Sequence, residues 1–137
     1  MKICSACLLG IRCRYDGKSK PNKKVLTLAK KELLIPVCPE MFGGLPIPRV
    51  PSEIRGKKVL SRTCKDVTLQ FKKGALEVLK ICRLFKIKQA ILKQRSGSCG
   101  SGQIYDGTFS GKIIKGDGIA TRLLKKHGIE VISEEQL

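Results

Sequence analysis

Four short apolar runs alternate with helical patterns along this chain, and that alternation constrains the fold more than any other feature of the sequence. The runs have the length of buried strands and cover residues 2–7, 33–38, 88–93 and 129–132. Strands that alternate with helices predict a parallel sheet with helices packed on it. We therefore expect an α/β fold with a mainly parallel sheet and helices on both faces.

Three helices are predicted between the runs, each preceded by a residue with a capping side chain. They are 23–31 capped by Asn22, 67–85 capped by Asp66, and a last helix capped by Asp117 and ending at His127. Residues 39–56 are rich in proline and residues 94–116 in glycine and serine, and neither stretch shows a period. We expect both stretches to be irregular loops, the first of them ordered.

Length and charge limit the classes of protein to consider. The 137 residues are expected to form a single domain, 1–137. The chain has 28 Lys and Arg against 11 Asp and Glu, a net charge of +17, which favours anionic partners such as nucleic acid. However, aromatic and basic residues do not interleave as a base-stacking platform requires.

A cytoplasmic location is expected. No apolar run approaches the roughly 18 residues of a membrane span. The start of the chain does not fit an export signal, because Arg12 stands where a small residue is needed before Cys13. Cysteines in a reducing compartment more often serve metal binding or catalysis than disulfides.

Three of the seven cysteines are placed by the predicted sheet at one edge. Cys7 closes the first strand, Cys38 closes the second, and Cys99 follows the third. Parallel α/β sheets bind ligands beyond the carboxyl ends of their strands, so these side chains are expected to converge there. Two metal centres are compatible with three thiolates: zinc, with Cys13 or His127 completing the shell, or an iron–sulfur cluster with one open iron.

Two other cysteines are predicted to be packing residues. Cys82 lies on the apolar face of the long helix, where a free cysteine behaves as a small hydrophobic residue. Cys4 lies within the first predicted strand, on the face opposite to Cys7. This arrangement disfavours a redox pair formed by Cys4 and Cys7.

The chain resembles the thiouracil desulfidase family in stretches that cover nearly its whole length. They are SACLLG (5–10), CRYDG (13–17), CPEMFGGLPIPRVPSEI (38–54), DVT (66–68), AILKQRSGSCG (90–100) and IYDGTFSG (104–111). The resemblance implies a [4Fe-4S] cluster held by Cys7, Cys38 and Cys99. It also implies that the open iron takes the sulfur of a small thiolated pyrimidine, such as 2-thiouracil, and that hydrolysis yields the oxo-pyrimidine without net redox change.

The same resemblance implies catalytic roles for Glu40 and Ser96. Glu40, two residues after Cys38, is predicted to take a proton from the attacking water, and Ser96 to pass a proton to the ring nitrogen. Asp16 and Ser98 are predicted to contact the substrate, although Asp16 precedes a glycine and also fits a turn.

The sequence departs from the family pattern at two positions, and its residues are also compatible with two other functions. Cys13 stands where other members often carry valine, which implies that it is not a ligand. The sequence has S-G-S-C at residues 96–99 where the family usually has S-P-S-C. Besides a C–S hydrolase acting on a free pyrimidine, an enzyme acting on thiolated uridine in tRNA and a non-catalytic zinc-stabilised binding module both remain compatible with the residues.

Overall fold

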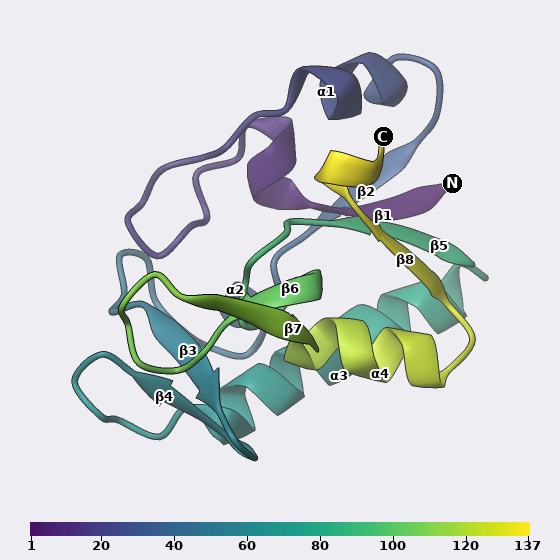
Figure 1. Cartoon of the computed structure of the whole chain (residues 1–137). Helices are drawn as coiled ribbons and strands as arrows, with labels where there is room; N and C mark the ends of the chain where they lie inside the picture. The colour runs from purple at the N-terminus through teal and green to yellow at the C-terminus, as the bar shows by residue number, and fades with distance from the viewer.

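A four-stranded parallel sheet forms the centre of the molecule (Figure 1). In this computed structural model, which describes residues 1–137, the strand order is β2-β1-β5-β8. The strands are β1 (Lys2–Ser5), β2 (Leu34–Val37), β5 (Gln89–Leu92) and β8 (Glu130–Ser133). All neighbouring pairs are parallel. The α/β fold with a parallel sheet built from the four apolar runs is therefore confirmed.

Helices cover both faces of this sheet, as predicted (Figure 1). One face carries the 3-10 turn η1 (Ala6–Leu9), α1 (Lys23–Ala29) and the C-terminal turn η2 (Glu134–Gln136), and the other carries α3 (Thr68–Leu84) and α4 (Ile119–Lys126). Strand alternation divides the core accordingly: Ala90 and Leu92 pack with α3 and α4, whereas Ile91 packs with η1 and α1.

One of the three predicted helix caps is present. The side chain of Asn22 accepts hydrogen bonds from the backbone N–H groups of Lys24 and Val25. The prediction for Asp66 is wrong, because the N-cap residue of α3 is Val67, and Asp66 lies one residue earlier, where its carboxylate accepts the backbone N–H of Thr68 at 2.9 Å. The prediction for Asp117 is wrong. Its carboxylate instead accepts a hydrogen bond from the backbone N–H of Gly102 at 2.8 Å. Asp117 is the last residue of a strand, and this strand pairs with the one that contains Gly102. α4 begins after Gly118 without a side-chain cap.

Both stretches that were predicted to be irregular loops contain strands of antiparallel hairpins, so this prediction was wrong for those residues. β3 (Ser52–Arg55) pairs with β4 (Lys58–Ser61), and β6 (Ser101–Tyr105) pairs with β7 (Ile113–Asp117). Gly56, with a φ of 62°, begins the two-residue turn of the first hairpin, which is a recognisable hairpin signal. A third apolar cluster joins both hairpins to the first turn of α3.

A close backbone contact between Pro39 and Gly74 holds the short helix α2 (Pro39–Phe42) against α3. A Cβ atom on Gly74 of α3 would lie 1.8 Å from the carbonyl oxygen of Pro39. Only glycine allows this approach of two backbones. Pro39 stands between Cys38 and Glu40, so the contact also positions both of these residues.

The substitution Gly74→Ala is expected to destabilise the protein by about 1–3 kcal/mol. Alanine gains up to about 1 kcal/mol in helix propensity, but the atoms that it would strike are backbone atoms and cannot rotate away. Urea unfolding measures the effect, with Lys73→Ala on the exposed side of the same helix as the control. A Gly74→Ala variant as stable as the unmodified protein would show that the two helices do not need this close contact.

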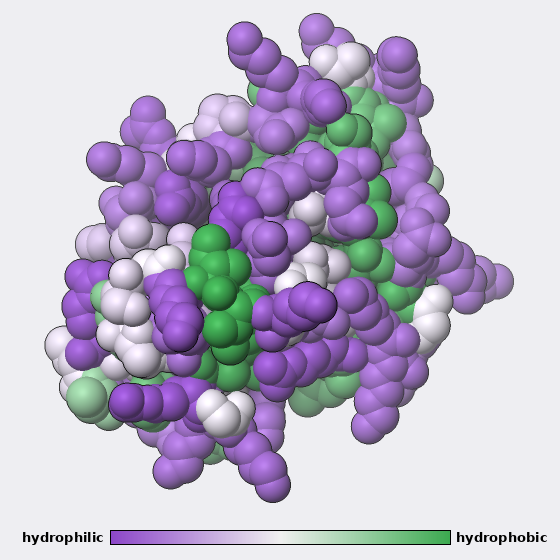
Figure 2. Space-filling model, viewed as in Figure 1, coloured by the Kyte–Doolittle hydropathy of each residue, from purple (hydrophilic) through white to green (hydrophobic).

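The face seen in Figure 2 is covered largely by hydrophilic side chains, in keeping with the net charge of +17. Apolar side chains gather over the β6–β7 hairpin, where Ile113 and Ile114 are exposed. None of the α-helices combines the length and the apolar composition needed to cross a lipid bilayer.

Candidate metal centre and active site

Three cysteines follow three adjacent strands at the carboxyl edge of the sheet. Cys38 directly follows β2, Cys7 lies in η1 after β1, and Cys99 follows β5 after a short loop. All three line one cavity of about 320 Å³. The structure thus brings the three predicted ligands together at the predicted edge.

The route by which Cys7 reaches the cavity differs from the prediction. β1 ends at Ser5, and the chain turns into η1, which Gly10 closes with a φ of 92°. Cys4 and Cys7 therefore do not share a strand, and the argument from opposite strand faces was wrong. Cys4 is nevertheless fully buried in the core, as predicted, and so is Cys82 on α3.

The three candidate ligands are thiols in a buried, hydrogen-bonded setting. The Cys38 thiol donates a hydrogen bond to the carbonyl oxygen of Cys13 at 3.7 Å. Burial raises the pKa of the Cys99 thiol to about 12, although hydrogen bonds from Ser5 and Ser98 favour its thiolate form. Metal binding must displace the thiol protons, and the serine hydroxyls are placed to stabilise the resulting thiolate.

The donor set fits an iron–sulfur cluster better than a single zinc ion. Thiolates suit both, but no three Cys, His, Asp or Glu side chains are gathered closely enough to hold one metal ion. In a cluster each cysteine binds a different iron, so its ligands are spaced more widely than around one zinc with Zn–S distances of about 2.3 Å. His127 ends α4 next to Arg83, before β8 begins, and so lies at the opposite edge of the sheet.

Glu40 lies in α2 at the wall of the cavity, held by two partners. Its Oε1 accepts a hydrogen bond from Nε of Arg49 at 3.2 Å, and its Oε2 accepts one from the hydroxyl of Ser98 at 3.2 Å. Arg49 also donates to the carbonyl oxygens of Cys13 and Pro46, at 2.9 and 3.1 Å. The carboxylate is thereby fixed where it can accept a proton from a water molecule in the cavity.

The two serines of the Cys99 loop have different surroundings. The Ser96 hydroxyl oxygen accepts the backbone N–H of Cys99 at 3.1 Å and lies 3.2 Å from the Ser98 hydroxyl. The Ser98 hydroxyl lies 3.2 Å from Glu40 Oε2 and 3.6 Å from Cys99 Sγ. Ser98, which was predicted to contact substrate, therefore links the carboxylate to a candidate cluster ligand.

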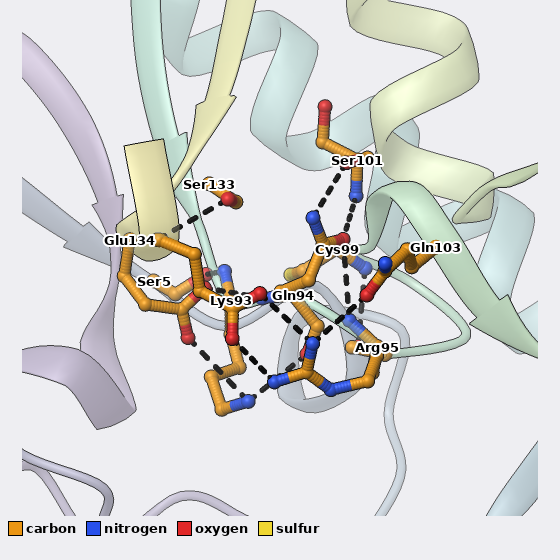
Figure 3. A network of polar contacts seen from close by, with 11 residues as sticks. Ser5, Lys93, Gln94, Arg95, Cys99, Ser101, Gln103, Ser133 and Glu134 are labelled. Atoms are coloured by element: carbon orange, nitrogen blue, oxygen red, sulfur yellow. Dashed lines mark hydrogen bonds and ion pairs between the residues drawn. The ribbon is translucent and has the colours of Figure 1, made fainter. Parts of the chain in front are cut away.

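A polar network holds this loop from beneath (Figure 3). The Gln94 side chain accepts the backbone N–H of Ser101 at 2.8 Å and donates to its carbonyl oxygen at 2.7 Å. The backbone N–H of Gln94 donates to Glu134 of η2 at 2.7 Å. On the other side, a Cβ atom on Gly118 would lie 2.4 Å from the backbone of Ser98. The loop is thus fixed by η2 and by the start of α4, neither of which was predicted to support the site.

Several residues of the cavity wall were not predicted. Arg14 stacks over Tyr15 with 5.5 Å from the guanidinium carbon to the ring centroid, and Arg62 stacks over Phe109 at 5.7 Å. All four line the cavity. Asp16, a predicted substrate contact, accepts the backbone N–H of Lys18 in a turn and is not among the lining residues.

Stability of the metal-free protein is expected to fall as the pH rises above about 9. Burial raises the pKa of Cys4 from 9.0 to about 12 and that of Cys82 to about 11. The unfolded chain loses these protons at lower pH than the folded chain, so ionisation favours unfolding as the pH rises toward the folded values. The contribution is fully present below about pH 9. Urea unfolding from about pH 7.5 to about pH 10.5 measures how the free energy of unfolding falls with pH. Cys82→Ala should make this fall less steep. An equally steep fall in Cys82→Ala would contradict the assignment to buried thiols.

Known proteins are similar to this chain over nearly its full length. Residues 3–136 match a family model described as 2-thiouracil desulfurase. The uncharacterized protein YbbK of Bacillus subtilis (strain 168) is 42% identical over 147 aligned positions, which cover 100% of this chain and 97% of YbbK. A solved structure described as the [4Fe-4S]-dependent thiouracil desulfidase TudS superposes with a TM-score of 0.94 and 46% identity, over 99% of this chain and 91% of that chain.

Proposed function

Because the chain belongs to the 2-thiouracil desulfurase family, we propose that it is a [4Fe-4S]-dependent desulfidase that replaces the sulfur of a thiolated pyrimidine by oxygen. The cluster ligands in this proposal are Cys7, Cys38 and Cys99. The observation that carries it is the convergence of these three thiols on one cavity that also holds the Glu40 carboxylate. A cavity of about 320 Å³ suits a ligand as small as a single pyrimidine ring.

When bound, a cluster with one iron free of protein ligands supplies a soft Lewis acid that polarises the thiocarbonyl group. Glu40 takes a proton from a water molecule, whose oxygen bonds to the ring carbon as the carbon–sulfur bond breaks. Arg49 and Ser98 hold the carboxylate for this step through the two 3.2 Å contacts. Ser96 supplies a proton at the ring nitrogen as water adds and takes it back as the carbonyl group forms. Sulfur leaves as hydrosulfide with the proton that Glu40 accepted, the second proton of the water is released to solvent, and no electrons are gained or lost overall.

A second candidate substrate is thiolated uridine within tRNA. The net charge of +17 favours a polyanion, and Arg14 and Arg62 line the cavity, each stacked over an aromatic ring. A base within a polynucleotide would also have to be turned out of its stack to reach the thiols. A direct comparison of turnover separates the two substrates.

The experiment compares the two substrates on protein loaded with iron and sulfide under anaerobic conditions. Free 2-thiouracil and thiolated tRNA are supplied at equal thiocarbonyl concentration, and uracil, uridine and hydrosulfide are measured. We expect uracil and hydrosulfide in equal amounts from the free base. Turnover of tRNA alone would replace the small-molecule proposal with the polynucleotide one, and a colourless protein that retains zinc and turns over neither would favour a binding module.

A further inference from the structure

A fourth thiol, that of Cys13, lies among the candidate ligands and has no part in the proposed reaction. Its side chain is 3% exposed and lines the cavity. It belongs with Cys7 to one cluster of buried side chains, and Cys38 packs against that cluster. None of the seven cysteines is joined in a disulfide in this structure.

The contacts are more extensive with Cys38 than with Cys7. The Cys38 thiol donates a hydrogen bond to the carbonyl oxygen of Cys13 at 3.7 Å. Cys38 is also half-buried, whereas Cys7 is buried, so a small reagent that enters the cavity reaches Cys38 more easily. Arg49 holds the backbone of Cys13 in place with a 2.9 Å hydrogen bond to the same carbonyl oxygen.

We propose that Cys13 and Cys38 form a reversible redox pair, in which peroxide joins them as a disulfide whenever no cluster is bound. The disulfide withdraws Cys38 from cluster assembly until a reductant restores it, and it shields Cys38 from irreversible oxidation. This function goes beyond desulfuration, and its effect on loading rests on the proposed role of Cys38 as a ligand.

The reaction balances with hydrogen peroxide as the oxidant. The Cys38 sulfur attacks one peroxide oxygen, the O–O bond breaks, and one water leaves while Cys38 becomes a sulfenic acid. The Cys13 sulfur then attacks the Cys38 sulfur, the S–S bond forms, and the S–O bond breaks to release a second water. The two thiols lose two electrons and the peroxide gains them. Without a neighbouring thiol, the sulfenic acid proceeds to sulfinic and sulfonic acids, which thiol reductants do not reverse.

The test uses the cluster-free full chain carrying Cys64→Ser, because Cys64 is an exposed thiol able to join two molecules. The protein is incubated with hydrogen peroxide at a mildly alkaline pH, because the thiolate is the form of cysteine that reacts. Free thiols are then alkylated, and the digested protein is analysed by mass spectrometry. We expect one cross-linked peptide pair, Cys13 with Cys38, and Cys7 in alkylated form.

Loading provides a second readout that does not depend on turnover. After peroxide treatment and then dithiothreitol, the Cys64→Ser protein should regain its full iron and sulfide content. Cys13→Ala in the same background should instead accumulate sulfinic and sulfonic acid at Cys38 and lose most of its loading capacity. Cys82→Ala, which removes a buried thiol outside the cavity, is the matched control and should behave like the background.

Three results would overturn the redox pair: a disulfide between Cys13 and Cys7, no intramolecular disulfide, or equal over-oxidation of Cys38 with and without Cys13. The cross-link is measured on a chain that retains Cys13, so poor folding of Cys13→Ala does not affect it. Absence of turnover by fully loaded protein would instead contradict the proposed function and leave the disulfide result unaffected.

Discussion

Replacement of Cys38 by alanine is expected to lower the iron bound after anaerobic loading from about four atoms per chain to nearly none. Cys38, Cys7 and Cys99 follow three adjacent strands at one edge of the sheet. Without one of the three thiolates, the chain would hold a cluster by only two protein ligands. We expect the same result for Cys7→Ala and Cys99→Ala, measured as iron and acid-labile sulfide per chain.

Two controls separate loss of a ligand from loss of the fold. Cys82→Ala removes a thiol buried between α3 and the sheet and should retain the full iron content. Cys13→Ala removes the fourth thiol of the cavity and should also load fully when it has not been exposed to oxidant. A Cys38→Ala protein that still binds four irons would exclude Cys38 as a ligand.

Replacement of Glu40 by glutamine is expected to lower kcat for 2-thiouracil by about 10²- to 10⁴-fold, the usual contribution of a general base. Glutamine keeps the size of the side chain but has no basic oxygen to accept the proton of water. Iron content and the visible spectrum should not change, because Glu40 is not among the proposed ligands. Rates are measured as uracil formed per loaded chain at saturating substrate.

Glu77→Gln is the matched control for this change, because Glu77 is a partly exposed carboxylate on α3 whose partner is Lys80 at 2.9 Å. It should leave kcat unchanged. If loaded Glu40→Gln protein retains the full kcat, another group takes the proton and the role assigned to Glu40 is incorrect.

The sheet and its helices could be predicted because their signals are local. Each central strand is a short apolar run, and the long helix α3 shows buried residues at helical spacing, from Phe71 to Cys82. The hairpins lack such signals. β7 is exposed or half-buried at every position, and its partner β6 includes a glycine with a φ of 94°, so neither strand shows clear alternation. In the first hairpin, the turn at Gly56 was a signal that the proline-rich surroundings obscured.

The position of the site at one edge of the sheet could be predicted from the strand topology, but the contacts between its residues could not. Parallel strands place Cys7, Cys38 and Cys99 at one edge whatever the local details. By contrast, Ser98 and Glu40 are 58 positions apart in the sequence and meet only because α2 is seated against α3 and the Cys99 loop is held by Gln94. A hydrogen bond of this kind depends on tertiary packing, and no local sequence pattern predicts it.

Hydrolysis in ¹⁸O-labelled water tests the central claim most directly. Protein loaded with iron and sulfide is given 2-thiouracil anaerobically, with no added oxidant or reductant. The account predicts uracil that carries one labelled oxygen at the carbon that held sulfur, together with one hydrosulfide per uracil. Uracil without label, or turnover that occurs only when an oxidant or reductant is added, would contradict non-redox hydrolysis at this site.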